Sequence, residues 1–403
     1  MIARLSLTNI ACFPSLEMAL EPLTVLVGPN AAGKSTVLRA LELLARWHSG
    51  GFEPDAVRTL GHWEGEHEWV GEEVWFYRKG SLPTLGIPRL NAKTWQVQAA
   101  STGHTFQVRQ SGPQLEVKDG ELSCLRSAEM AEQVSNFQEH DAEGLAWNDP
   151  FWARHLRYGP TLPGRSLSVQ LLQLERRALA APSLPVGEHA MLAADGSGLA
   201  SHLSAFANTD REILEKIEAD LREIVPQVRR IRTPEVRVRR PVMRPFAVGD
   251  QVIQVPGEED QMGHRLELDV QGSGRVPAEL LSEGTLIALG LLTAINHPRR
   301  PNLLLLDDLD RGLHLNAQVR VVRVIQRLQE LNPQLQVVAT THSPFQLEGL
   351  QPEQIRVHAV RPDGTAAAAR LADHPEIERW SKTFRTDELW ANLGEDWVLE
   401  AGS

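Results

Sequence analysis

The sequence predicts an α/β fold, and three observations support this class. An apolar, β-prone run at 23–27 leads into a glycine-rich loop at 28–36, and helix-like spacing follows the loop. The last third of the chain alternates apolar strands with a helix. Between these parts, short aromatic or β-branched runs separated by Gly, Pro and Asn are typical of antiparallel hairpins.

The glycine-rich loop has the spacing G-x-x-x-x-G-K-S of a phosphate-binding loop. Gly28 and Gly33 let the backbone curl so that its N–H groups point at phosphates. Lys34 adds a positive charge for the outer phosphates, and the Ser35 hydroxyl can bind Mg²⁺. The loop therefore predicts binding of a nucleoside triphosphate with Mg²⁺.

The other elements are expected from periodicity, taken in chain order. In the first part we expect strands at 2–10, 16–20 and 23–27 and a helix at 36–47. In the middle we expect strands at 74–77, 94–97, 105–108, 115–117, 236–238 and 265–270, and helical spacing at 128–140, 166–181 and 212–224. In the last part we expect strands at 303–306, 335–340 and, as the final strand, 355–360, with a helix at 317–331.

These elements divide the chain into four parts. Residues 1–49 and 271–403 are expected to form the two halves of a nucleotide-binding domain. A β-hairpin and helical insertion is expected at 50–190, and a connecting helical and β lobe at 191–270. The phosphate-binding loop is thus separated from the C-terminal motifs by a long insertion.

Composition excludes several classes of protein. The chain has 403 residues, 42% of them hydrophobic, and a net charge of −11, which fits a soluble globular protein without a uniformly basic surface. Only Cys12 and Cys124 occur, so a disulfide framework or zinc site is not expected and a reducing compartment is. No signal-peptide core and no apolar run of ~20 residues is present, so we expect a cytoplasmic protein without a membrane partner.

An apolar strand at 303–306 ends in two carboxylates, Asp307 and Asp308. In phosphate-loop ATPases the first acid of such a pair holds Mg²⁺ through water. The second orients or activates the attacking water. We therefore expect Asp307 to serve the metal and Asp308 to serve catalysis.

Two further motifs are candidates for the γ-phosphate. Ser282 and Gly284 stand where a helix begins, and a hydroxyl with free N–H groups at a positive dipole end can receive a phosphate. An ordinary helix cap with Glu283 in the first turn explains the same residues nearly as well. His342, just past a strand, can contact the γ-phosphate and the attacking water, although a lone histidine there is more often structural.

Taken in order, the phosphate loop, L-S-x-G-T, the acid pair, G-L-H and T-H-S-P resemble the ABC-type ATPase heads of the SMC/RecF/OLD group. The resemblance is closer to the compact AAA-family ATPases described as RecF-like or OLD-like, and 2–10, 195–200, 224–226 and 386–390 share it. It implies an ABC-type, P-loop NTPase head with a mixed β-sheet, a helical lobe and a β-rich insertion.

The resemblance also implies a site shared between two heads that sandwich ATP, in a homodimer or a higher homo-oligomer. It assigns ATP contacts to Asn30, Ala31, Gly33, Lys34, Ser35 and Thr36, and Mg²⁺ to Ser35 and Asp307. Lys34 then contacts the β- and γ-phosphates, and Thr36 contacts the α-phosphate. Ser282 and Gly284 act from the partner head, Asp308 and His342 act in hydrolysis, and ATP hydrolysis reopens the dimer.

Three positions depart from, or leave open, the family pattern. Asp308 stands where the family usually has Glu, which places its carboxylate about 1.5 Å further from the water and makes slow hydrolysis a hypothesis. Arg311 replaces a neutral amide and is either an interfacial cation or a salt-bridged surface residue. The glutamine that follows the first lobe is either Gln96 or Gln98.

Three biological roles compete. The resemblance favours the sensor ATPase of a bacterial anti-phage or toxin–antitoxin-like system with a separate effector, since no Toprim nuclease follows His342. The alternative is a RecF/SMC-like head in DNA repair or maintenance, supported by seven arginines from Arg229 to Arg244 with only Glu235 as an acid among them. Arg237 and Arg239 would lie on one face of a strand, where they either bind the phosphates of DNA or protect a solvated sheet edge.

The third role, a transporter ATPase, is disfavoured by the β-rich insertion.

Overall fold

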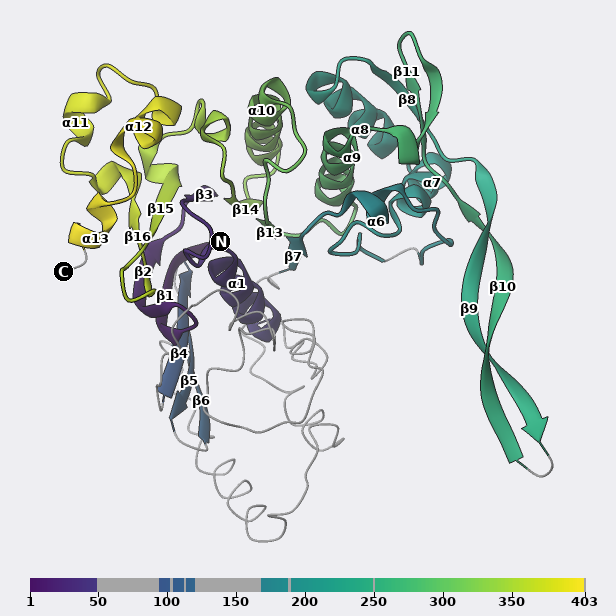
Figure 1. The fold of residues 1–403 in the computed structure, drawn as a ribbon, viewed down its shortest axis with the longest axis horizontal. Helices are drawn as coiled ribbons and strands as arrows, with labels where there is room; N and C mark the ends of the chain where they lie inside the picture. The colour runs from purple at the N-terminus through teal and green to yellow at the C-terminus, as the bar shows by residue number, and fades with distance from the viewer. Residues whose placement is uncertain are drawn as a thin grey trace. The chain divides into compact units, whose positions relative to one another are not determined.

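The computed structural model describes residues 1–48, 94–101, 104–111, 114–119, 168–187, 190–248 and 251–401. The chain folds as two compact units, each assembled from separated segments (Figure 1). Unit 1 comprises Met1–Leu171, Pro301–Leu309 and Gln326–Ser403, and unit 2 comprises Leu172–Arg300 and Asp310–Ile325. The strand expected at 74–77 and the helix expected at 128–140 lie outside the described residues.

Unit 1 contains a mixed six-stranded sheet in the order β16-β15-β3-β14-β13-β7. Its strands are β16 (Ala366–Arg370), β15 (Ile355–Val360), β3 (Leu23–Val27), β14 (Gln336–Thr340), β13 (Leu303–Leu306) and β7 (Val169–Leu172). The central strands β15, β3, β14 and β13 are parallel to one another, and β3, β14 and β13 are buried along their whole length. A strand that is buried on both faces has a continuous run of apolar residues, and for this reason these strands could be predicted from the sequence.

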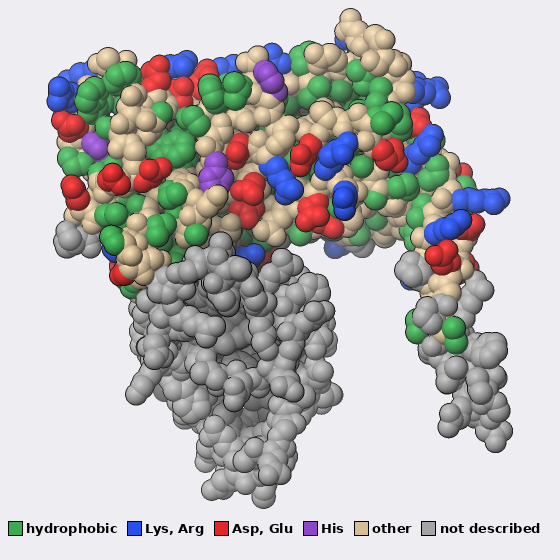
Figure 2. Space-filling model, viewed as in Figure 1, with side chains coloured by type: hydrophobic (Ala, Val, Ile, Leu, Met, Phe, Trp, Pro, Cys, Tyr) green, Lys and Arg blue, Asp and Glu red, His purple; other side chains and the backbone are tan. Residues whose placement is uncertain are grey.

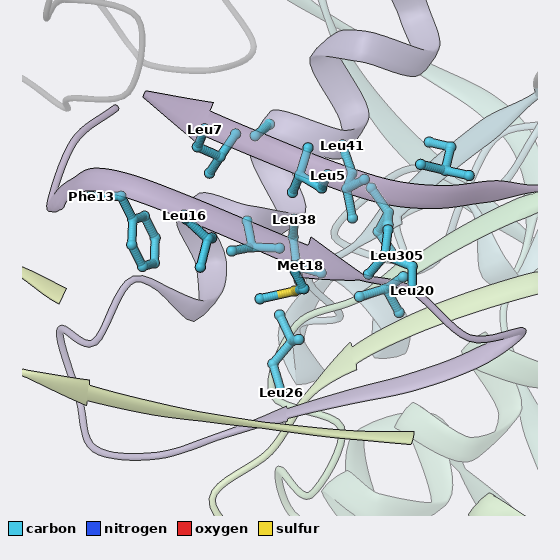
Figure 3. Packing of buried hydrophobic residues seen from close by; sticks show 14 of the residues in the cluster. Leu5, Leu7, Phe13, Leu16, Met18, Leu20, Leu26, Leu38, Leu41 and Leu305 are labelled. Atoms are coloured by element: carbon cyan, nitrogen blue, oxygen red, sulfur yellow. The ribbon is translucent and has the colours of Figure 1, made fainter. Parts of the chain in front are cut away.

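A second, antiparallel sheet of unit 1 has the order β2-β1-β4-β5-β6. It consists of β1 (Ile2–Ile10), β2 (Phe13–Ala19), β4 (Thr94–Ser101), β5 (His104–Ser111) and β6 (Gln114–Asp119). Helix α1 (Lys34–His48) packs between the sheets, and the core gathers side chains from β1, β2, β3, α1 and β13 (Figure 3). Leu5, Leu38 and Leu305 are among its fully buried members.

Two predictions about these elements are wrong. The helical spacing at 166–181 belongs to strand β7 and the short helix α6 (Arg176–Ala180), because β7 joins the sheet beside β13 and short apolar runs do not distinguish strand from helix. Strand 355–360 is not the last, because β16 pairs antiparallel with it. Four consecutive alanines, 366–369, favour a helix by propensity, and the sheet edge overrides that preference.

Unit 2 is built on helices and two small sheets. Its helices are α6, α7 (Leu199–Thr209), α8 (Arg211–Ile224), α9 (Glu283–Asn296) and the first part of α10 (Leu315–Leu331). A three-stranded sheet has the order β12 (Gly274–Pro277), β11 (Glu267–Val270) and β8 (Val228–Arg232). Every residue of α9 from Gly284 on is buried, so this helix is apolar on all sides.

The described residues also form several short helices. They are η2 (Ala278–Leu280), η3 (Pro344–Leu347), η4 (Pro352–Gln354), η5 (Leu371–Asp373), α11 (Ile377–Trp380), α12 (Thr386–Leu393) and α13 (Trp397–Ala401). None of the helices described is long and apolar enough to cross a membrane.

A long two-stranded ribbon, β9 (Glu235–Val248) and β10 (Gln251–His264), extends from the other elements of unit 2 (Figure 1). Its register places Arg239 opposite Asp260, and the Arg239 guanidinium lies 3.6 Å from Glu258 and 3.9 Å from Asp260. Arg239 and Arg240 therefore lie opposite the acids Asp260 and Glu259, which the sequence holds about twenty positions away. Acidic and basic side chains are also interspersed over the face in Figure 2.

Two buried histidines make stability depend on pH. Burial lowers the pKa of His202 in unit 2 and of His358 in unit 1 from 6.5 to about 4. Because the unfolded chain takes up these protons below pH 6.5, stability is present above that pH and is lost as the pH falls toward 4. We expect a loss of about 3 kcal/mol per histidine, measured by urea unfolding at several pH values. A His202→Gln variant should lose less over this range, and an equal loss would contradict the assignment.

Candidate nucleotide-binding site

The phosphate-binding loop has a backbone that only small residues allow at its two ends. Gly28 and Gly33 have φ angles of 134° and 79°. A Cβ atom on Gly28 would lie 2.3 Å from the backbone oxygen of His358, and one on Gly33 would lie 2.4 Å from the Phe13 ring. Since β3 ends immediately before the loop and α1 begins at Lys34, the loop stands between a buried strand and a helix N-terminus.

Lys34 is held against this loop. Its Nζ donates to the carbonyl oxygens of Gly28 at 2.8 Å and Pro29 at 2.7 Å. Only 6% of the residue is exposed. The ammonium is therefore positioned by the loop itself, next to the backbone expected to surround the phosphates.

The loop and the acidic strand meet at Asp307, which is 272 residues from Ser35 in the chain. The Ser35 Oγ donates to Asp307 Oδ1 at 3.0 Å, and the Thr340 Oγ1 donates to the same oxygen at 2.7 Å. A hydroxyl beside one carboxylate fits Mg²⁺, which proteins bind with one or two carboxylates plus phosphate oxygens and water. Among the described residues there is no cluster of three acids, histidines or cysteines that could hold a metal ion.

Asp308 adopts a left-handed backbone conformation, with a φ of 53°. Its N–H donates to Thr340 Oγ1 at 2.8 Å, and the next N–H, of Leu309, donates to the Thr340 carbonyl. The side chain of Asp308 is exposed, so it can reach a water molecule at this edge. The conformation also gives a reason for Asp in place of Glu, because Asp is enriched among non-glycine residues with positive φ.

Thr340 links the two acids, and the sequence did not single it out. We expect Thr340→Val to weaken Mg²⁺·ATP binding about tenfold, because it removes a donor to Asp307 and leaves the Asp308 N–H without its acceptor. Titration with a fluorescent ATP analogue measures this, and thermal unfolding should show a loss of about 1–3 kcal/mol. Thr340→Ser keeps the hydroxyl and is the matched control. Wild-type affinity in the Val variant would show that the hydroxyl does not organise the acids.

His342 lies at the same edge of the sheet. The preceding residue, Thr341, is buried, and its N–H donates to the Leu26 carbonyl at 3.1 Å, one residue before the end of β3. The Thr341 hydroxyl accepts the N–H of Ser343 at 3.0 Å. These two bonds fix the backbone on both sides of His342, whose side chain is exposed.

The predicted γ-phosphate segment lies in unit 2. Ser282 is the cap of α9, since its Oγ accepts the Thr285 N–H at 3.2 Å and shares a 2.7 Å hydrogen bond with the Thr285 hydroxyl. Gly284 packs so closely on the next motif that a Cβ would lie 2.5 Å from the Gly312 oxygen. The capping interpretation is thus correct, and an exposed Ser282 at a helix N-terminus remains compatible with phosphate binding.

Arg311 has an acidic neighbour in the same unit. Its Nε lies 3.3 Å from Glu283 Oε1, with 52% and 32% of the two side chains exposed. This is the salt-bridged surface residue of the two interpretations, and an exposed pair of this kind contributes little to stability. The pair places the Arg311 guanidinium next to Glu283, the residue that follows Ser282.

Comparison with known proteins decides the family. A family model described as an AAA domain, putative AbiEii toxin, Type IV TA system, matches residues 23–73 and 164–348, which is more than half of the chain. The chain belongs to this family of ATPases. A curated OLD nuclease from Thermus scotoductus (strain ATCC 700910 / SA-01) is 48% identical over 44 residues, which are 11% of this chain and 8% of that protein. The chain therefore matches only a small part of that relative's length.

Comparison with solved structures agrees with this family assignment at the level of the fold. A crystal structure of the Smc head bound to the C-winged helix domain of ScpA aligns with 91% of this chain and 96% of its own, at a TM-score of 0.51 and 13% sequence identity. The predicted ABC-type ATPase fold of the RecF/OLD/SMC-like group is therefore confirmed.

Within this ABC-type ATPase, the structure adds a residue beneath the phosphate loop that the sequence did not indicate. His358 on β15 is fully buried, and its Nδ1 donates to the Ala32 carbonyl at 2.9 Å. Burial, together with the charges of Lys34 and Arg356, lowers its pKa to about 4, so the ring is neutral at pH 7. Cys12 lies against Gly33, and burial raises its pKa to about 11. Both side chains support the loop without charge.

The glutamine assignment stays open. Gln96 and Gln98 both lie on β4, opposite Thr8 and Ser6 of β1, and their side chains are outside the described residues.

Proposed function

We propose that this chain binds and hydrolyses ATP with Mg²⁺ and works as an ATP-gated dimer switch in the cytoplasm. The observation that carries the proposal is the hydrogen bond from Ser35 to Asp307, which joins the phosphate loop to the acidic strand. Lys34 neutralises charge on the β- and γ-phosphates, and Asn30, Ala31, Gly33 and Thr36 bind the nucleotide through the loop and the first turn of α1. Mg²⁺, held by Ser35 and Asp307, would offset the charge that develops on the phosphates.

Asp308 is proposed to orient the attacking water and accept its proton. His342, fixed at the end of β14, is proposed to contact the γ-phosphate. The shorter carboxylate of Asp308 leads us to expect slow turnover, which an ATPase assay measures. A rate like that of transporter ATPases would contradict this part of the proposal.

The dimer is proposed because two of the residues expected to contact phosphate, Ser282 and Gly284, lie in unit 2, whereas the phosphate loop belongs to unit 1. Ser282 is exposed at the N-terminus of α9, a helix of 14 residues, and Gly284 follows it in the first turn of that helix. Such a helix end attracts a γ-phosphate. We propose that each head presents Ser282 and Gly284 to the ATP held by its partner, in a homodimer or a higher homo-oligomer.

The biological role is proposed from the family. The family description names a type IV toxin–antitoxin system, and the OLD nuclease match is a partial one. We propose a sensor ATPase of a bacterial defence system that controls a separate effector protein. A DNA-binding role through Arg229–Arg244 is less favoured, because Glu258, Asp260 and Asp269 lie against arginines of that segment.

Light scattering after size exclusion tests the switch. Asp308→Ala protein should form a dimer or larger species only with ATP and Mg²⁺, and adding Lys34→Ala should abolish the shift. If the mass does not change with ATP, the gated dimer is wrong. A Ser282→Arg variant should bind ATP but lose ATPase activity and the shift, and full activity in it would contradict the contribution from the partner head.

Phage challenge tests the role. Cells carrying the gene with its chromosomal neighbours should resist a phage panel, and Lys34→Ala should restore plaque formation. Equal plaque formation with and without the wild-type gene across the panel would contradict the defence role while leaving the ATPase assignment intact.

A further inference from the structure

A cavity of about 590 Å³ lies within unit 2 and shares no residue with the proposed nucleotide site. Its walls come from α8, the end of α7, β8 and the neighbouring strands β11 and β12. Five arginines and three glutamates line it. Which of these charges are already paired decides what the cavity, here called the arginine pocket, can bind.

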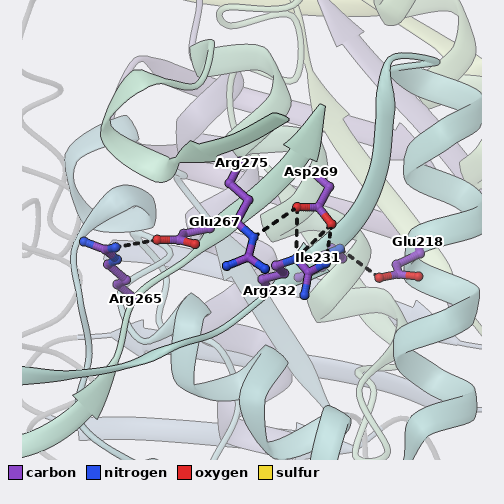
Figure 4. Close-up of polar contacts among 7 residues, drawn as sticks. All are labelled: Glu218, Ile231, Arg232, Arg265, Glu267, Asp269 and Arg275. Atoms are coloured by element: carbon purple, nitrogen blue, oxygen red, sulfur yellow. Dashed lines mark hydrogen bonds and ion pairs between the residues drawn. The ribbon is translucent and has the colours of Figure 1, made fainter. Parts of the chain in front are cut away.

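The three glutamates are all engaged. Glu215 pairs with Arg211 at 3.0 Å, one turn apart on α8. Glu218 accepts the backbone N–H of Ile231 at 2.8 Å, and Glu267 pairs with Arg265 (Figure 4). Glu215 and Glu267 are thus paired with arginines, whereas Glu218 is bonded to a neutral N–H and keeps its charge, so one unpaired carboxylate stands against Arg229, Arg230 and Arg275.

Arg232 is also engaged, and it stiffens one wall. Its Nε lies 2.9 and 2.8 Å from the two carboxylate oxygens of Asp269, and its Nη2 lies 2.7 Å from Oδ2 (Figure 4). Arg275 approaches the same carboxylate only to 4.0 Å, and 67% of its side chain is exposed. Arg232 thus holds Asp269 at short range, whereas the longer and exposed contact of Arg275 leaves most of its donors in solvent, where they can bind another anion.

Arg229 and Arg230 point to the surface together because β8 is irregular. In the pairing of β11 with β8, Asp269 faces Arg230 and Val270 faces Val228, so Arg229 is an extra residue. Such a bulge re-aims a side chain that would otherwise point to the opposite face. Both residues are exposed and both line the pocket. The Arg229 side chain donates to the neutral amide of Gln271. The Arg230 side chain has no hydrogen bond or ion pair with any described residue, and its charge acts on Asp269 only through a longer-range electrostatic interaction.

We propose that the arginine pocket binds a small ligand with two or more phosphate groups, held by Arg229, Arg230 and Arg275. Guanidinium groups bind phosphate oxygens in pairs of hydrogen bonds, and three of them around one cavity match a compact polyanion. The volume is that of a site for a nucleotide-sized molecule.

An extended nucleic acid fits the same surface less well. Beyond the pocket the arginines continue onto the β9–β10 ribbon, where Glu258 and Asp260 lie beside Arg239. A long phosphate backbone would meet these acids, whereas a small ligand ends within the cavity. The pocket is therefore assigned to a small molecule.

Calorimetry with inorganic triphosphate tests this proposal. The Lys34→Ala chain is used throughout, so that binding at the nucleotide site is suppressed, and ionic strength is held constant. Adding Arg229→Gln and Arg230→Gln should raise the Kd about tenfold or more. Arg177→Gln, an exposed arginine of α6 outside the pocket, is the matched control and should leave the Kd unchanged.

Three outcomes overturn the proposal. These are no triphosphate binding to the Lys34→Ala chain, an equal Kd in the pocket variant, and an equal weakening by Arg177→Gln. A short single-stranded oligodeoxynucleotide is titrated in parallel, and tighter, pocket-dependent binding of it would assign the surface to nucleic acid instead. If the double substitution disturbs folding, Arg230→Gln alone is used, because that side chain has no hydrogen bond or ion pair within the described residues.

Discussion

Replacing Asp308 with Asn is expected to lower ATP turnover by about 10²-fold or more while leaving ATP binding close to that of the wild type. Asparagine has the same shape and tolerates the left-handed conformation observed at this position, where φ is 53°. The backbone N–H that donates to Thr340 is also retained. The substitution therefore removes only the carboxylate that would accept the proton of the attacking water.

The measurement combines steady-state ATP hydrolysis with titration of a fluorescent ATP analogue. Glu378→Gln, which removes an exposed carboxylate of unit 1 on α11, is the control and should turn over ATP at the wild-type rate. Turnover within a few-fold of the wild type in Asp308→Asn would show that another group activates the water. A parallel loss of ATP binding would show instead that Asp308 acts on the nucleotide or metal.

Replacing Gly28 with Ala is expected to destabilise the protein by about 3 kcal/mol or more and to abolish nucleotide binding. The new Cβ would lie 2.3 Å from the His358 backbone oxygen, which cannot move freely because β15 pairs with β3 in the same sheet. Either the two strands separate or the loop shifts. Both responses move the N–H groups that are expected to surround the phosphates.

Gly349→Ala is the matched control for this effect. Gly349 also has a positive φ, 82°, but nothing lies within 4 Å of its Cβ position. It therefore carries only the backbone strain, about 1 kcal/mol. Thermal unfolding and ATP-analogue binding are measured for both variants. Equal losses of stability, with nucleotide binding kept in Gly28→Ala, would show that the contact with β15 does not determine the loop.

The elements around the nucleotide could be predicted because their signals are local. Strand β13 was expected at 303–306 and spans Leu303–Leu306, and β3 and β15 also match their expected bounds. A buried parallel strand is a continuous apolar run, and a phosphate loop is a fixed pattern of glycines and a lysine. Neighbouring residues are sufficient to specify both.

The wrong predictions concern segments whose conformation depends on pairing with a strand that is distant in the sequence. Residues 169–172 form a strand because β13 offers an edge, and the alanines of 366–369 do so because β15 does. The side chain of Arg311 is a similar case. The sequence favoured neither an interfacial cation nor a salt-bridged surface residue, and the structure places Glu283 beside it. Pairing of this kind depends on burial across the sheet or the helix, which local propensity does not contain.

By itself, then, the sequence determined the α/β class, the loop from Gly28 to Thr36, the acid pair at Asp307 and Asp308, and the resemblance to ABC-type ATPases. Only the tertiary structure decided that Ser35 meets Asp307, that Thr340 joins both acids and that His358 supports the loop. It alone also made Arg229 the extra residue of a bulge beside Arg230 and placed acids opposite Arg239 and Arg240 of β9. The reason is that backbone conformation follows from adjacent residues, whereas contacts across hundreds of positions form only when the chain buries its apolar strands together.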